Sequence, residues 1–167
     1  MVLMAAVLAG CTPWATYPKI EGAGDITNPN LPPIPELMAL SILWGAENYP
    51  EGVEATEDAA YFYNLPEGTP PQVYRRVGIR MGQGEPLERV GTPAYHVQMV
   101  RVRAVEAEVD LIAPRQDGLY DLVTLSFKQH IARGWRVIDY RVWRVRVDVP
   151  EPTFESAPVE DETGTAS

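Results

Sequence analysis

The sequence holds few residues that could perform acid-base chemistry. Its only histidines are His96 and His130. Either one would need to lie inside a pocket beside a carboxylate, such as Asp121 or Asp139, to form a catalytic pair. Alternation along the predicted strands places both histidines on the face of the sheet that does not carry the apolar side chains. We therefore expect His96 and His130 on the solvent-facing side of the protein.

Asp139 remains as a candidate catalytic base. It falls on the same side of its predicted strand as Trp135 and Val137, where burial would raise the pKa of a carboxyl group. The alternative is that Asp139 caps a backbone group or pairs with a neighbouring arginine. The sequence by itself leaves both roles open.

No residue pattern predicts a metal site or a cofactor. Two separated histidines and the single cysteine, Cys11, lack the spacing of metal ligands. The chain has no glycine-rich phosphate loop after a strand and no Gly-x-Ser-x-Gly motif. The formal net charge is -9, with no basic run, which argues against general nucleic-acid binding.

The N-terminus has the features of an export signal. Its first ten residues are uncharged and mostly apolar, too few to span a bilayer, which needs about twenty, but suited to a secretory signal. Leu8-Ala9-Gly10-Cys11 resembles the lipobox of bacterial lipoproteins, which implies cleavage before Cys11 and acylation of its sulfur by palmitate-like chains. Because no Lys or Arg precedes the apolar run, the signal is unusually short or the true start lies before Met1. The alternative to lipidation is an ordinary apolar N-terminus with a chance thiol.

We expect four regions along the chain. They are a signal peptide at 1–10, a lipidated cysteine and Pro/Gly-rich tether at 11–34, a single α+β domain at 35–148 and a disordered acidic tail at 149–167. Within the domain, the patterns predict helices at 35–48 and 70–81, the second with Thr69 as N-cap and Gln72 completing a capping box. A short strand is expected at 61–63.

The stretch from Tyr95 to Val147 predicts a four-strand antiparallel meander. Its apolar alternation changes sides near Met99 and again after Val137, and a β-bulge at each place would return the apolar residues to one face. Arginines recur on one side of the first and last strands, and we expect them to pair across strands with the acids of the second, unless they bind an anionic partner. These arginines are Arg101, Arg103, Arg136, Arg144 and Arg146, and the acids are Glu106, Glu108 and Asp110. Bulges curve a sheet, so we expect a cone closed by the two helices. Candidates to line its pocket are Trp44, Tyr63 and Trp135.

The final hairpin resembles one seen in a known superfamily. The segments Val-Thr-Leu-Ser-Phe at 123–127 and Gly-Trp-Arg-Val at 134–137, followed by Asp139, are similar to the nuclear transport factor two-like (SnoaL-like) superfamily. The resemblance covers residues 35–148 and implies a cone-shaped fold. It also implies either isomerase or dehydratase chemistry inside the cone or a non-catalytic binding or assembly role.

Three functions therefore follow from the sequence. The first is a lipid-anchored domain of the bacterial cell envelope, facing the periplasm or the exterior, that binds a small ligand or an envelope protein without catalysis. The second is an isomerase or dehydratase with Asp139 as base. The third is a structural subunit that forms a homodimer through an exposed sheet face.

Overall fold

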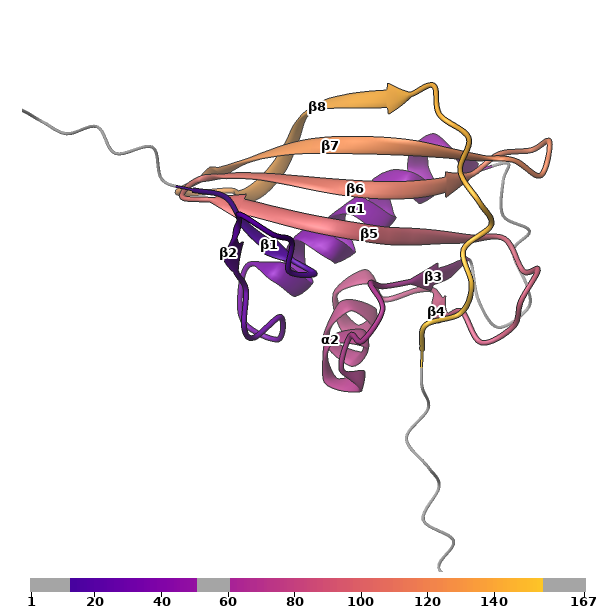
Figure 1. Ribbon diagram of the computed structural model, residues 1–167, viewed down its shortest axis with the longest axis horizontal. Helices are drawn as coiled ribbons and strands as arrows, with labels where there is room; N and C mark the ends of the chain where they lie inside the picture. Colours follow the sequence, from indigo (N-terminus) through magenta and orange to yellow (C-terminus); the bar gives the residue numbers. More distant parts are fainter. Residues whose placement is uncertain (1–12, 51–60, 155–167) are drawn as a thin grey trace, which may run out of the picture.

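The fold is α+β, with two helices packed on an open, curved sheet of eight strands (Figure 1). The computed structural model describes residues 13–50 and 61–154. The elements, in chain order, are β1 (Ala15–Tyr17), β2 (Gly24–Asp25), α1 (Ile34–Asn48), β3 (Phe62–Asn64), α2 (Pro71–Met81), β4 (Glu85–Pro86), β5 (Ala94–Arg103), β6 (Glu106–Pro114), β7 (Tyr120–His130) and β8 (Gly134–Trp143).

The predicted meander forms the body of the sheet. Strands β5, β6, β7 and β8 pair antiparallel in sequence order, and the full path runs β2-β1-β5-β6-β7-β8. Strand β3 pairs parallel with the start of β5 and with β4. The meander prediction is confirmed.

Both predicted bulges are confirmed. The register between β5 and β6 shifts between Val97 and Met99, so Val97 and Val100 both reach the buried face. The register between β7 and β8 shifts in the same way, because Phe127 pairs with Val137 and Ser126 pairs with Asp139. An extra residue in each strand thus corrects the broken alternation and bends the sheet.

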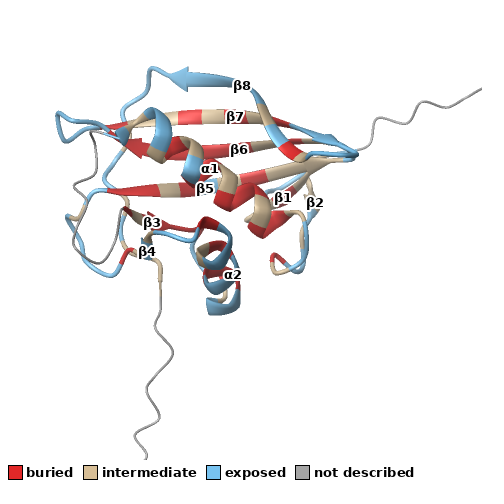
Figure 2. Ribbon diagram, turned by 180° about the vertical axis from the view of Figure 1, so that it is seen from behind, coloured by how far each residue is buried: buried red, intermediate tan, exposed pale blue. Residues whose placement is uncertain are grey.

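Helix α1 covers the inner face of the sheet and contacts β5 and β6 (Figure 2). Leu37, Met38 and Ile42 have no exposed surface. At Gly45 the helix lies so close to the sheet that an added Cβ would come within 2.9 Å of Cδ1 of Tyr95 and 3.0 Å of Cδ2 of Leu111. At this point side chains fill the space between helix and sheet.

Helix α2 buries the predicted stripe of Val73, Val77 and Met81 and ends at Gly82, whose φ of 70° suits glycine. The predicted capping box is wrong. The helix begins at Pro71 with Pro70 at the N-cap position, so Thr69 lies outside it and donates its hydroxyl to the Pro66 carbonyl oxygen at 2.5 Å. Pro70 has an extended conformation.

The tether prediction is wrong for residues 13–33. Strand β1 pairs antiparallel with β5, where Thr16 lies opposite Arg101, and β2 pairs with β1. The guanidinium of Arg103 also lies 4.7 Å from the centroid of the Trp14 ring. Pairing with the edge of β5 holds this segment in place, because each strand supplies hydrogen-bond partners for the backbone of the other. The signal peptide and Cys11 lie outside the described residues.

The disordered-tail prediction is wrong for residues 149–154. After β8 the chain turns back and crosses the outer face of the sheet, opposite α1, toward β3 and α2 (Figure 1). There Phe154 packs on Tyr74 with ring centroids 4.8 Å apart. Residues 155–167 lie outside the described part of the chain.

Candidate functional site

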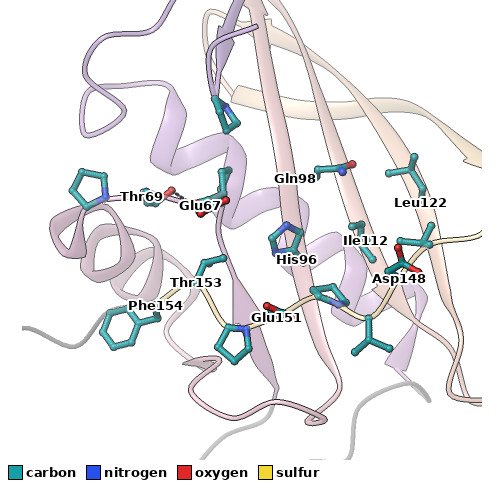
Figure 3. A pocket seen from close by; sticks show the side chains of 18 of the residues that line it. Glu67, Thr69, His96, Gln98, Ile112, Leu122, Asp148, Glu151, Thr153 and Phe154 are labelled. Atoms are coloured by element: carbon teal, nitrogen blue, oxygen red, sulfur yellow. Dashed lines mark hydrogen bonds between the residues drawn. The ribbon is translucent and has the colours of Figure 1, made fainter.

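A groove lies between the outer face of the sheet and the returning C-terminal segment, residues 145–154, which we call the strap (Figure 3). Its volume is about 1120 Å³. The floor is formed by side chains that project from the outer face of β5, β6 and β7: His96, Gln98, Ile112 and Leu122. The strap forms one wall, and Pro18 with residues 66–71 closes one end.

Asn64 fixes the end of the strap. Its side chain has no exposed surface, its Nδ2 donates to the Glu151 carbonyl oxygen at 2.6 Å, and its Oδ1 accepts the backbone N–H of Thr153 at 3.1 Å. The hydroxyls of Thr153 and Tyr74 lie 2.8 Å apart. These contacts join β3, α2 and the C-terminal segment, so the groove has a defined wall.

His96 lies on the groove floor, where the strap covers it. Its Nδ1 atom is shielded from solvent and has no hydrogen-bond partner among the described residues. Burial lowers the pKa of the His96 imidazole to about 4, so the ring is neutral at pH 7. The predicted face is correct for His96, but its side chain is half-buried rather than fully exposed, because strand alternation indicates the face and not the later segment that partly covers it. The prediction of a surface histidine is confirmed for His130, which is exposed at the end of β7.

The groove carries an excess of negative charge. Its charged side chains are Glu67, Asp148 and Glu151 on the acidic side and Arg146 on the basic side. All four are exposed to solvent. Because His96 is neutral, the groove favours a cationic or uncharged molecule over an anion.

Asp139 lies on the outer face of β8 and is exposed, opposite Ser126 of β7. The prediction of a desolvated carboxylate inside the cone is therefore wrong. The bulge at Ile138 is the reason, because it reverses the side to which the next residue points. The Asp139 carboxylate accepts the backbone N–H of Tyr140 at 2.9 Å, which matches the alternative role of a backbone cap.

The three predicted pocket-lining residues mainly fill space between the helices and the sheet. Trp44 packs on Tyr140 with ring centroids 5.1 Å apart, and Trp135 is buried in the core. Tyr63 donates its buried hydroxyl to the Tyr74 carbonyl oxygen at 3.2 Å, and burial raises its pKa. Tyr63 also borders a shallow surface groove beside α2. The structure does not bring these three residues together around one cavity.

The predicted cross-strand ion pairs form on the outer face for the arginines of β5, whereas Arg136, Arg144 and Arg146 make no ion pair within residues 13–50 and 61–154. Arg101 makes a two-bonded pair with Asp110, which also accepts the hydroxyl of Thr124 at 2.6 Å. Arg103 pairs with Glu106 at 2.7 Å. The other predicted acid, Asp121, pairs with Arg115 at 3.4 Å and lies two strands from His96, on the opposite side of the sheet. These contacts are those of a structural network.

Within residues 13–50 and 61–154, no group of three or more His, Cys, Asp or Glu side chains is arranged to hold a metal ion. In the same residues, neither helix has the length and apolar character needed to cross a membrane. No protein-family model matches the sequence, and neither a curated protein nor a solved structure matches it.

Sequence reasoning missed the groove because it treated the strap as tail. The proline-rich acidic composition of the segment is typical of disorder. The signal that points the other way is Phe154, an aromatic residue in the acidic segment, which is half-buried and packs on Tyr74.

Proposed function

We propose that this chain is a non-catalytic domain of the bacterial cell envelope that binds a small polar ligand in the groove beneath the strap. The observation that carries the proposal is His96, whose shielded nitrogen lacks a partner on the groove floor. Buried polar atoms in folded proteins nearly always have a hydrogen-bond partner, and at an exception that borders a groove a water molecule or a ligand can complete the bonding. A ligand that displaces part of the strap would reach this atom.

The chemistry of the groove defines the class of ligand. The acidic groups Glu67, Asp148 and Glu151 outnumber the one base, and Gln98 offers an amide from the floor. A ligand with N–H or O–H donors, either cationic or uncharged, is the best match. The volume of about 1120 Å³ suits a small molecule.

We further propose that the domain is anchored through a lipid on Cys11 and belongs to the nuclear transport factor two-like (SnoaL-like) superfamily. The sequence Leu8-Ala9-Gly10-Cys11 supports the anchor, and the curved sheet covered by two helices supports the superfamily. Strand β1 begins at Ala15. Four residues span at most about 14 Å, so an anchor at Cys11 would hold the domain close to the membrane surface.

The isomerase or dehydratase alternative depends on an acid inside the cone. Asp139 is exposed on the outer face, and α1 packs directly on the sheet at Gly45. No observation on the described residues favours this alternative over binding.

Ligand binding is tested by recording amide chemical shifts of the isotope-labelled chain with three probes: spermidine, glucose and citrate. We expect spermidine or glucose to shift signals of His96, Gln98 and the strap, and citrate to leave them unchanged. A matched variant, His130→Phe, removes the exposed histidine and should bind as the wild type does. If none of the three probes moves the groove signals, or if citrate alone does, the proposed ligand class is wrong.

The anchor has a separate test, because binding and anchoring can fail independently. We expect a palmitate analogue fed to bacteria expressing the chain to label the wild type and not the Cys11→Ser variant. Label retained on Cys11→Ser would contradict lipidation at this position.

A further inference from the structure

Strand β8 is the outermost strand of the sheet, and among the described residues only β7 pairs with it. Its edge carries apolar side chains that are largely open to solvent. They are Ile138, Tyr140, Val142 and Trp143, with exposed fractions between 41% and 58%. The strand contains no proline and no lysine, two residues that commonly block pairing at a sheet edge.

The backbone of Tyr140 is directed away from β7. Its N–H donates to the carboxylate of Asp139 rather than across the ladder. In an antiparallel strand the N–H and C=O of one residue point the same way, so Tyr140 presents both groups at the free edge. A second strand could pair with Tyr140 there.

The charges on either side of Tyr140 are opposite. Asp139 and Arg141 both lie on the outer face, opposite Ser126 and Thr124 of β7. Within residues 13–50 and 61–154 neither one makes an ion pair. A strand that places a basic residue opposite Asp139 and an acidic residue opposite Arg141 would form an ion pair with each of them.

We propose that this partner strand is β8 of a second copy, paired antiparallel with its two-fold axis at Tyr140. In that register Tyr140 pairs with Tyr140 of the partner subunit and Asp139 lies opposite Arg141 of the partner subunit. The symmetry repeats each contact, so one sequence supplies both ion pairs. The axis also brings Ile138 opposite Val142 of the partner subunit and covers two exposed apolar side chains on each copy.

The inner side of the strand supports the same register. The ring of Tyr140 packs on Trp44 of α1 with centroids 5.1 Å apart. A second Tyr140 at the axis would extend this aromatic pair. The bulge at Ile138 ends the regular edge, so the new ladder is short and the dimer reversible.

The outer face is a poorer surface for a second copy. The strap crosses it at one end, and the network of Arg101, Asp110 and Thr124 occupies its centre with satisfied polar groups. The edge of β8 offers apolar surface together with backbone groups that pair with no other described strand. This inference does not depend on ligand binding in the groove.

Sedimentation velocity on the full chain carrying Cys11→Ser tests the proposal across a range of concentrations. We expect reversible dimers, and we expect Asp139→Arg or Arg141→Asp alone to raise the dimer dissociation constant about tenfold, since each places like charges together twice. The double variant Asp139→Arg/Arg141→Asp exchanges the charges and should restore association. A matched charge change far from the edge, Arg76→Asp on α2, should have no effect.

A cysteine at the axis tests the register directly. In the Cys11→Ser background, Tyr140→Cys places two thiols across a paired position, where Cα atoms about 5.5 Å apart allow a disulfide. We expect mild oxidation to link Tyr140→Cys chains much faster than Ile79→Cys chains, whose residue is exposed on α2. Circular dichroism confirms that each variant is folded.

A monomer at every concentration, single charge variants that associate like the wild type, or a different protein bound to β8 of a monomeric chain would each overturn the proposal.

Discussion

Asn64 accepts the backbone N–H of Thr153, which lies 89 positions later in the chain, at 3.1 Å. Through this contact the end of a short strand near the middle of the sequence holds the C-terminal segment across the outer face. The same amide donates to the Glu151 carbonyl oxygen at 2.6 Å. This fully buried side chain, together with Tyr74, therefore holds the strap beside His96.

Replacing Asn64 by alanine should release the strap. The change leaves the backbone groups of Glu151 and Thr153 without their buried partner, and each such loss costs about 1–3 kcal/mol. We expect the free energy of unfolding to fall by about 2–4 kcal/mol in urea denaturation. We also expect trypsin to cleave the folded variant faster than the wild type after Arg144, just before the strap, and after Arg146, its second residue.

The matched control is Asn48→Ala, which removes an exposed asparagine from the end of α1. It should change the free energy of unfolding by no more than about 0.5 kcal/mol. Equal effects of the two substitutions, with no change in trypsin cleavage, would show that Asn64 does not hold the strap.

His96 should make stability depend on pH. Its pKa is about 4 in the folded chain against 6.5 for an unperturbed histidine, because burial disfavours the charged ring. Between pH 4 and 6.5 the unfolded state therefore binds more protons than the folded state. The stability contributed by neutral His96 is fully present above about pH 6.5 and is lost as the pH falls toward 4, by up to about 3 kcal/mol.

Comparison with His96→Phe isolates this effect from the titration of carboxylates, which the two proteins share. The difference in unfolding free energy between wild type and variant, measured by urea denaturation at several pH values, should change steadily between pH 6.5 and 4. The exposed residue provides the control, since His130→Phe should follow the wild-type curve. A difference that stays constant over this range would mean that His96 is not buried beneath the strap.

The meander was predictable because its strands alternate. The sides change at Gln98 and Ile138, and in each case one extra residue is the simplest way to keep all apolar side chains in one core. Helix α1 was predictable to within one residue at its start, because Pro35 marks a first turn and the following residues are apolar around most of the helix. These features depend on neighbours close in sequence.

The groove was not predictable because it depends on contacts between distant segments. Alternation gave the correct face for His96, yet the strap that covers it is held by Asn64 and Tyr74, which are more than 70 residues away. Asp139 was misplaced for a related reason. The bulge was predicted, but an extra residue at Ile138 also turns the next side chain, that of Asp139, to the outer face, and the prediction placed it on the inner face.

The buried carboxylate on the outer face should be a strong determinant of stability. Asp110 is 8% exposed and accepts two bonds from Arg101 and one from Thr124. Asp110→Ala removes the acid and leaves the half-buried guanidinium of Arg101 with a weaker partner, so we expect a loss of about 2–4 kcal/mol in thermal or urea unfolding.

Glu108→Ala is the control for the same arginine. Glu108 lies 3.7 Å from Arg101 and is more exposed than Asp110, so its loss should cost less than about 1 kcal/mol. A larger loss for Glu108→Ala than for Asp110→Ala would contradict the assignment of Asp110 as the main partner.

The close seating of α1 on the sheet predicts that Gly45 tolerates no larger side chain. A Cβ at this position would lie 2.9 Å from Cδ1 of Tyr95 and 3.0 Å from Cδ2 of Leu111. Both of these side chains are buried. Alanine gains about 1 kcal/mol of helix propensity over glycine, but overpacking a filled core costs about 1–3 kcal/mol. We therefore expect Gly45→Ala to lower the melting temperature, and Gly45→Val to lower it further.

Leu43→Ala, a change on the more exposed side of the same helix, should have a smaller effect than Gly45→Val. If Gly45→Ala raises the melting temperature, space remains between α1 and the sheet, and an enclosed pocket inside the cone would again become a candidate site.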